Sequence, residues 1–506
     1  MILNRTKGVI DRSGRSFKYG SKTTGVQTTP AGIHRAASVT DCAFASPAKQ
    51  VRGDRLLCGR LAVGSSKPRV LLIAPTALDS AGRPIKQSRL YLPGLTLPML
   101  AALTPSRFEL RLIYDSVHDI PFHEHWDLVG LTGMGSGVSR AWAIADEFRK
   151  RKIPVVMGGI GASLGDPAWT LAHVDSFVIG EAEEIWPRLL ADFEAGRLQP
   201  LYRNEELLSL DDLPEPRYDL VDRTRLGWWR PVQASRGCPY RCTFCAVTSY
   251  FRGTHRCRPV EQVVRDVRAA KRSGARHIGF IDDNIAVDWD YCGRLWEALI
   301  PEKIVWMSQC SLHIAERPEM LRLARRSGCR LLSFGIESMN SAALGRVEKS
   351  WNHPEHYAEW VARVRAHGIE VSTEMIVGFD EDDEAVFQRT LDFLLGCRIA
   401  VPRVHILTPI PGTPLFAELL REGRILHQDF SRYTGGQVVF RPRQFEPQQL
   451  QEKYWQMYRT ILSWPGISRR LRGNPAGLGP RMRAFVLGVN LHYRRHLHRG
   501  ITPGIV

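Results

Sequence analysis

Short apolar runs alternate with helical patterns along the first half of the chain, starting at Lys67. Apolar runs predict strands at residues 70–74, 108–114, 128–132, 155–157 and 176–179, and we expect the last of these to end the sheet. Apolar positions at helical spacing predict helices over 95–103, 140–152 and 182–193. This alternation predicts an α/β domain with a parallel, doubly wound (Rossmann-like) sheet, which binds ligands at the carboxyl ends of its strands.

Six further strand–helix units follow in the second half. The predicted strands are 231–235, 277–281, 304–309, 330–335, 370–377 and 403–407. The predicted helices are 259–273, 289–299, 317–327, 353–367 and 384–396, three of which are ended by Gly274, Gly328 and Gly368. Six such repeats predict a partial (β/α)6 barrel, with its functional groups at the carboxyl ends of the strands.

The remaining segments connect or extend these two units. Residues 415–450 have the pattern of a loop-rich connection, and apolar spacing predicts helices over 447–464 and 481–499. We therefore expect a weakly structured or disordered basic extension, a first domain, a linker, a barrel and a mostly helical C-terminal region, at residues 1–66, 67–210, 211–229, 230–415 and 416–506 respectively.

The formal net charge of +17 lies at the two ends of the chain. Residues 1–66 carry 11 Lys and Arg against 3 Asp and Glu, and residues 451–506 carry 10 against 1. The body between them is balanced, which argues against nucleic acid as the main partner. The basic C-terminal helix has two interpretations, a peripheral contact with a membrane or packing on the barrel with its arginines in water.

The chain shows no sign of membrane insertion or of a disulfide framework. No uninterrupted apolar stretch reaches 18 residues, so we expect no transmembrane helix. Apart from one cluster, the cysteines are scattered, which favours a reducing, cytoplasmic location.

That cluster lies in the run Ser235-Arg236-Gly237-Cys238-Pro239-Tyr240-Arg241-Cys242-Thr243-Phe244-Cys245. A closed zinc site needs four protein ligands, and His255 or Cys257 downstream could complete one. Three thiols on one short loop instead suit a [4Fe–4S] cluster whose fourth iron stays open for substrate.

This run resembles the hallmark of the radical S-adenosylmethionine (SAM) superfamily, C-x3-C-x-Φ-C, with Phe244 as the aromatic Φ. The resemblance implies that Cys238, Cys242 and Cys245 ligate a [4Fe–4S] cluster and that SAM binds its open iron. It also implies an external one-electron reductant of the flavodoxin or ferredoxin type and the formation of a 5′-deoxyadenosyl radical.

The same resemblance implies SAM contacts at the carboxyl ends of the barrel strands. Glu337, in the sequence Phe334-Gly335-Ile336-Glu337-Ser338, matches the family's fourth-strand motif, and a carboxylate there accepts the ribose hydroxyls. We expect further cofactor contacts from Phe244, Asp282, Gln309, Ser338 and Glu374.

The first domain is similar to the cobalamin-binding domain that precedes the barrel in many radical SAM enzymes. Glycines follow three of its strands, where they leave room and free amides for a bulky ligand. The cobalamin contacts we expect are Gly133, Ser136, Gly158, Gly159, Gly180 and Glu181. An NAD site is disfavoured because the first strand ends in Pro75-Thr76-Ala77 and not in G-x-G-x-x-G.

Together these resemblances imply a cobalamin-dependent (class B) radical SAM enzyme, most simply a methyltransferase acting on an unactivated carbon of a lipid, a tetrapyrrole or a natural-product intermediate. The alternatives are an oxidative cyclase or a rearrangement enzyme with the same domains, and a non-catalytic protein that binds cobalamin or SAM. A tRNA methylthiotransferase is disfavoured because no cysteine lies between residues 67 and 200, where its second cluster would be held.

Overall fold

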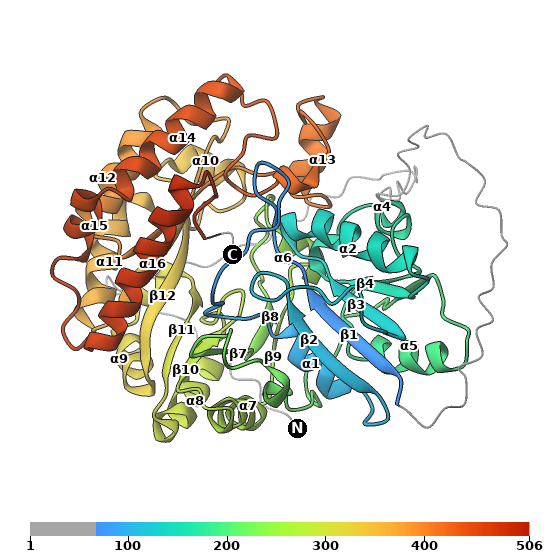
Figure 1. The fold of residues 1–506 in the computed structure, drawn as a ribbon. Coiled ribbons are helices and arrows are strands. Elements are labelled where there is room, and N and C mark those ends of the chain that lie inside the picture. Colours follow the sequence, from blue (N-terminus) through green and yellow to red (C-terminus); the bar gives the residue numbers. More distant parts are fainter. Residues whose placement is uncertain (1–66, 505–506) are drawn as a thin grey trace, which may run out of the picture. The chain divides into compact units, whose positions relative to one another are not determined.

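The computed structural model describes residues 67–504 (Figure 1). The expected extension over residues 1–66 lies outside the described residues. The α/β class expected from the sequence is confirmed: two parallel six-stranded sheets follow one another along the chain, and helices make up most of the C-terminal region.

The first sheet has the strand order β2-β1-β3-β4-β5-β6. Its strands are β1 (Arg69–Ala74), β2 (Glu109–Tyr114), β3 (Leu128–Thr132), β4 (Val155–Gly158), β5 (Ser176–Ile179) and β6 (Leu201–Arg203). Its helices are α1 (Thr96–Leu103), α2 (Val138–Lys150), α3 (Ile160–Ser163), α4 (Pro167–Leu171) and α5 (Ile185–Glu194). Val70 and Leu72 pack on one face of the sheet while Leu71 and Ile73 pack on the other, as a doubly wound sheet requires.

The second sheet has the order β14-β13-β12-β11-β10-β7, all strands being parallel. Its strands are β7 (Trp229–Val232), β10 (His277–Phe280), β11 (Val305–Cys310), β12 (Cys329–Glu337), β13 (Glu370–Val377) and β14 (Val401–Ile406). The helices that follow or flank them are α7 (Val260–Arg272), α8 (Trp289–Leu299), α9 (Pro318–Ser327), α10 (Ser341–Arg346), α11 (Tyr357–Ala366) and α12 (Val386–Gly396). The outer strands β7 and β14 do not pair with each other, so the sheet is not closed and forms the expected partial barrel.

Three expectations about elements were wrong. The first sheet does not end at residue 179, because β6 adds a sixth strand beside β5. Residues 231–235 are not one strand: the Ala234 amide donates to the Asp282 carboxylate instead of to a strand, so β7 stops at Val232 and β8 (Ser235–Gly237) pairs with β9 (His255–Cys257). The region 415–450 is not only loop, because Thr413 caps α13 (Pro414–Arg421).

The C-terminal region contains α14 (Pro447–Ile461), α15 (Trp464–Leu471) and α16 (Pro480–His498). Arg470 of α15 is fully buried and joins these helices to the barrel. Its guanidinium donates to the carbonyls of Ile399, Ala400 and Ile461 and to the side-chain oxygen of Asn490 in α16. Burial lowers the pKa of Arg470 to about 10. The four oxygens accept hydrogen bonds from its buried guanidinium, which would otherwise lack partners.

We expect Arg470→Met to destabilise the protein by about 2 kcal/mol or more, since it removes the arginine donor from the Ile399 carbonyl and from the Asn490 side-chain oxygen. Urea unfolding followed by circular dichroism measures the loss. Arg469→Met is the matched control: its side chain is exposed, so its effect should stay within about 0.5 kcal/mol. Equal effects of the two substitutions would contradict the anchoring role of Arg470.

Candidate functional site

The cysteine loop starts directly at the end of the small β8–β9 sheet. Gly237, the last residue of β8, has φ +84°, and a Cβ at this position would lie 2.2 Å from the Thr254 carbonyl oxygen. Only glycine fits there without strain. The backbone therefore turns into Cys238 at a fixed point beside the barrel.

Two carboxylates that follow β10 hold the approach to this loop. Asp282 accepts hydrogen bonds from the Ala234 amide (3.1 Å) and the Ser235 hydroxyl (2.6 Å). Asp283 accepts from the Gly237 amide at 2.9 Å. Asp282 is fully buried, and burial raises its pKa to about 6. The structure thus engages Asp282 with the strand before the cysteines, while its expected contact with SAM stays a prediction.

The three thiols lie close enough to influence one another. Burial raises the pKa of the Cys242 thiol to about 12, Lys349 opposes the shift, and Cys245 and Cys238 add to it. Burial also raises the pKa of Cys238. All three cysteines are free thiols, so they are available as ligands once a metal displaces their protons.

The donor set fits an iron–sulfur cluster better than a single ion. Among residues 67–504, no group of three His, Cys, Asp or Glu side chains converges as the ligands of one metal ion. A zinc knuckle would require that convergence, whereas a [4Fe–4S] cluster places each thiolate on a different iron. His255 and Cys257 contact each other instead, with Nδ1 and Sγ 3.9 Å apart.

An ion pair lies beside the thiols at the end of β12. The Lys349 ammonium donates to Oε1 of Glu337 at 2.7 Å, and both side chains are buried. Burial disfavours a charged lysine, yet Glu337 and Cys242 raise the pKa of Lys349. Glu337 has φ +64°, and its carboxylate folds over Gly335, where a Cβ would lie 2.6 Å from Oε1. A Cβ at position 335 would therefore displace the Glu337 carboxylate and the Lys349 ammonium from their present positions.

The other residues expected to contact SAM are placed differently. Glu374 forms an ion pair with Arg403 and accepts a hydrogen bond from Nε2 of His405 at 3.1 Å. The Ser338 hydroxyl accepts from the Asn340 amide, Gln309 is exposed near the end of β11, and Phe244 packs on an apolar cluster that includes Phe379 and Leu407.

Buried charges join the first sheet to the cysteine loop. Glu181, in the turn after β5, accepts from Arg236 at 2.7 Å and from both terminal nitrogens of Arg256 at 2.9 Å. Glu183 pairs with the same Arg236. These residues belong to one compact unit of the chain, which the structure describes over residues 67–504. Sequence reasoning expected Glu181 at cobalamin, but both of its oxygens are engaged by arginines; its neighbour Gly180, also expected there, has φ +96°.

Burial opposes ionisation of Glu181, but hydrogen bonds from Arg256 and Arg236 hold its pKa below the ordinary 4.5. The two neighbouring glutamates raise the pKa of the buried Arg236 further above its ordinary range, although burial acts in the opposite direction. The four charges therefore balance in a largely buried site.

Glycine loops pack backbone against backbone at the carboxyl ends of β3 and β4. The Gly133 amide donates to the Gly158 carbonyl at 2.6 Å, and the Gly161 amide donates to the Gly133 carbonyl at 3.0 Å. A Cβ on Gly159 would lie 2.5 Å from the Gly133 carbonyl oxygen, and one on Gly161 would lie 2.6 Å from the Gly135 nitrogen. Ser136 is buried in the short turn that follows.

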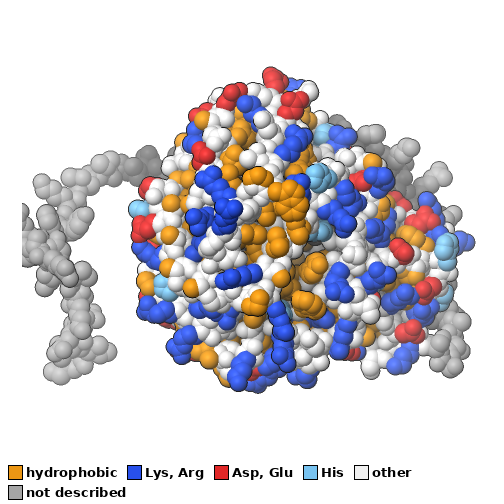
Figure 2. Space-filling view, turned by 60° about the vertical axis from the view of Figure 1, so that its left-hand side comes forward, with side chains coloured by type: hydrophobic (Ala, Val, Ile, Leu, Met, Phe, Trp, Pro, Cys, Tyr) orange, Lys and Arg blue, Asp and Glu red, His pale blue; other side chains and the backbone are white. Residues whose placement is uncertain are grey.

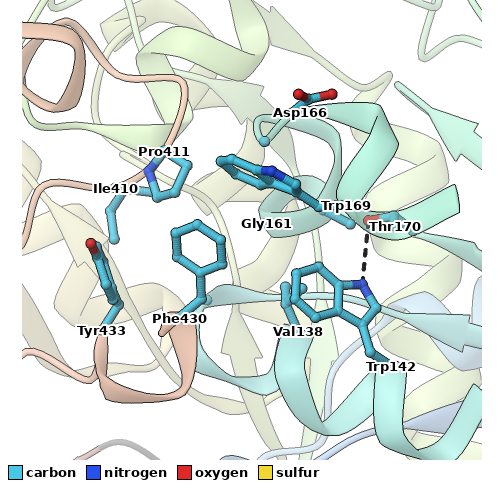
Figure 3. A pocket seen from close by; sticks show the side chains of 13 residues that line it. Val138, Trp142, Gly161, Asp166, Trp169, Thr170, Ile410, Pro411, Phe430 and Tyr433 are labelled. Carbon is cyan, nitrogen blue, oxygen red and sulfur yellow. Dashed lines mark hydrogen bonds between the residues drawn. The ribbon is translucent and has the colours of Figure 1, made fainter. Parts of the chain in front are cut away.

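An aromatic pocket opens beside these loops (Figure 3). Its empty space is about 450 Å³, part of it open to solvent. Gly135 and Gly161 line one side, while the rings of Trp142, Trp169 and Phe430 surround the space; Trp169 and Phe430 are 4.8 Å apart between ring centres. No local pattern in the sequence predicts this pocket, because Ile410, Phe430 and Tyr433 come from far along the chain.

Comparisons with known proteins match these features. A model of the radical SAM superfamily matches residues 232–394. Bacteriochlorophyllide d C-12(1)-methyltransferase of Chlorobaculum tepidum is 28% identical over 419 residues, which cover 81% of this chain and 91% of the relative. Hopanoid C-2 methylase of Rhodopseudomonas palustris is 26% identical over 72% of each chain.

A solved structure shares the fold. The cobalamin-dependent SAM radical enzyme OxsB, determined with aqua-cobalamin and SAM bound, superposes with a TM-score of 0.62. The match has 16% sequence identity and covers 85% of this chain and 72% of OxsB.

We expect Glu181→Gln to destabilise the protein by about 3 kcal/mol, because it leaves buried arginine charge uncompensated. The control is Glu194→Gln, which removes the carboxylate that pairs with the exposed Arg107. It should lower the free energy of unfolding by about 1 kcal/mol or less.

The depressed pKa of Glu181 gives this prediction a pH signature. The stabilisation is present above pH 4.5 and is lost as the pH falls through the folded-state pKa. The difference in free energy of unfolding between wild type and Glu181→Gln should therefore narrow below pH 4.5. Urea titrations at several pH values measure it; a gap that stays constant would contradict the ionic origin.

Proposed function

We propose that this chain, which belongs to the cobalamin-dependent group of the radical SAM superfamily, methylates an unactivated carbon of a small organic substrate. The observation that carries the proposal is the loop of three free thiols, held by buried carboxylates at the carboxyl ends of the barrel strands. The methyltransferases among its relatives support methyl transfer as the reaction.

Cys238, Cys242 and Cys245 would hold the [4Fe–4S] cluster. When bound, the cluster supplies the electron that cleaves SAM, and cobalamin carries the methyl group. Lys349 places a buried positive charge beside these thiols, which favours their thiolate forms. Asp283 fixes the first turn of the loop through the Gly237 amide, so the thiols are oriented before any ligand binds.

The glycine loops and the aromatic pocket would hold cobalamin. Gly133, Ser136, Gly158 and Gly159 lie at the strand ends, where a doubly wound sheet binds its ligand. The flat rings of Trp142, Trp169 and Phe430 suit a flat heteroaromatic group, and the glycines leave no side chain in its way. We assign Glu181 to joining the two sheets and keep Gly180, in the same turn, as a cobalamin contact.

SAM would lie between the cysteine loop and the end of β12. We propose Glu337 as the acceptor of its ribose hydroxyls, with Lys349 fixing the carboxylate through Oε1. Phe244, Gln309 and Ser338 remain proposed contacts, and Asp282 and Glu374 are weaker candidates because protein partners already engage their carboxylates.

For the substrate we propose a tetrapyrrole or a lipid, the classes that the names of the relatives indicate. We also propose an external one-electron reductant of the flavodoxin or ferredoxin type. The domain limits at residues 67–210, 211–229, 230–415 and 416–506 belong to the same proposal.

Anaerobic reconstitution with iron, sulfide and hydroxocobalamin tests the function. Wild type should bind about four iron and one cobalt per chain and should form 5′-deoxyadenosine from SAM after reduction. Cys242→Ala should lose the iron and the SAM cleavage but keep cobalt, because the pocket lies on the other sheet. Cys397→Ala, a cysteine away from the loop, is the control. Iron and 5′-deoxyadenosine without cobalt would leave a radical SAM enzyme and remove methyl transfer by cobalamin.

Gly161→Ala tests the cobalamin site. Its Cβ would lie 2.6 Å from the Gly135 nitrogen and would force the two loops apart, so we expect cobalamin binding to weaken about tenfold or more. Gly94→Ala is the matched control, since no atom lies within 4 Å of its added Cβ. Equilibrium dialysis with hydroxocobalamin measures both; equal affinities of the two variants would remove these loops from the site.

A further inference from the structure

Helix α16 carries apolar side chains on its outer side as well as its inner side. Met482, Val486 and Tyr493 are buried against the rest of the protein, as the packing interpretation of this helix expects. On the opposite side Leu487 and Leu491 are 41% and 39% exposed. They are one helical turn apart and form an outward apolar stripe.

Two exposed tryptophans lie next to α16, at positions on either side of it. Trp464 of α15 is 60% exposed, and the Arg494 guanidinium lies 4.9 Å from its ring centre, which places this tryptophan beside α16. Trp228 is 67% exposed; its neighbour Trp229 packs on Phe485 of α16 at 5.2 Å. Because a helix turns about 100° per residue, positions 485 and 494 face opposite flanks of α16. We call Trp228, Trp464, Leu487 and Leu491 the α16 face.

The surroundings of the α16 face are positively charged without compensation. Residues 464–499 contain eight arginines and no aspartate or glutamate. Within this described segment no arginine forms an ion pair with a carboxylate, and the buried Arg470 is the only one of the eight withdrawn from the surface. Figure 2, which brings the side with α15 and α16 forward, shows a hydrophobic band between groups of Lys and Arg.

We propose that the α16 face docks on the surface of an anionic lipid bilayer. Tryptophan prefers the headgroup level, aliphatic side chains enter the acyl boundary, and each nearby arginine contributes about 1 kcal/mol on an anionic membrane. RNA would use the arginines and the tryptophan rings but has no use for an aliphatic stripe. Among the described residues no helix is long and apolar enough to span a bilayer, so the contact is peripheral.

The position of α16 gives the docking a consequence for access to the barrel. Its Phe485 contacts β7 through Trp229, and its Asn490 donates to the Ala400 carbonyl just before β14 at 2.9 Å. The helix therefore lies across the open side of the barrel, between β7 and β14, which do not pair with each other. Docking would hold this side of the barrel at the bilayer, where a membrane-dissolved substrate is concentrated; this consequence rests on the proposed function, whereas the docking itself does not.

Flotation of the full-length, cofactor-loaded protein with vesicles tests the proposal. We expect binding to phosphatidylcholine vesicles that contain about one third phosphatidylglycerol, weaker binding to pure phosphatidylcholine, and a decrease as salt screens the arginines. Leu487→Asp/Leu491→Asp should reduce the bound fraction about tenfold, because two carboxylates cannot enter the interface.

The control is Leu201→Asp/Leu426→Asp, which adds the same charge at leucines that are 41% and 39% exposed elsewhere. Thermal unfolding checks that both double variants fold. The proposal is overturned if the full-length protein ignores anionic vesicles at low salt, if both double variants lose binding equally, or if the α16 variant keeps it. Loss of single-stranded RNA binding in that variant, without vesicle binding by wild type, would reassign the face to nucleic acid. No outcome depends on SAM cleavage or methyl transfer.

Discussion

A loop that carries three thiols between Gly237 and α6 (Ala246–Phe251) has little regular structure of its own, so its neighbours determine its geometry. At the start of the loop, the Gly237 amide donates a hydrogen bond to the Asp283 carboxylate. Farther along, the Thr243 amide donates to the Val347 carbonyl, and the Leu415 amide donates to the Thr243 carbonyl. The loop is therefore fixed from three sides by segments that follow different barrel strands. Everything proposed for the site depends on this support, because a cluster with an open iron tolerates little displacement of its thiolates.

The same loop is tied to the first sheet by charge. Arg236 precedes Gly237 directly, and its guanidinium reaches Glu181 and Glu183 on the far side of the junction. Buried ion pairs gain little net stability because desolvation offsets their attraction, but removing one partner is costly. Such a cluster therefore adds little net stability, but it favours one arrangement of the two sheets over all others. That selection matters for the proposed reaction, in which two cofactors act on one substrate.

The parts of the fold that sequence predicts are those with local signals. The barrel strands β12 and β13 are apolar runs that begin just after Gly328 and Gly368. Both glycines have the positive φ that ends a helix. The strand β6 has no such signal, since Leu201 is exposed and only pairing with β5 defines it. For α13 the sequence does contain a local signal, because Thr413 as N-cap followed by Pro414 is typical of the start of a helix.

The cysteine motif identified the chemistry of the site, but not how its residues are used. Asp282 and Glu181 resemble cofactor ligands in the sequence, and in the structure both are engaged by the protein itself. Only tertiary structure separates a carboxylate that faces a ligand from one that holds a strand. The aromatic pocket was beyond prediction for a related reason: Trp142 and Phe430 meet there, with ring centres 6.4 Å apart, from opposite ends of the described chain.

Two groups of arginines in this chain have different physical meaning. Inside the molecule, Arg236, Arg256 and Arg403 each face a carboxylate, while the buried Arg470 donates to neutral oxygens. On α15 and α16 every arginine except the buried Arg470 is exposed or half-buried, and none has an acidic residue in its own segment. Uncompensated surface charge repels itself and so disfavours the folded state slightly. Its accumulation around an exposed apolar stripe is therefore better explained by an anionic surface that both features contact together than by the stability of the fold.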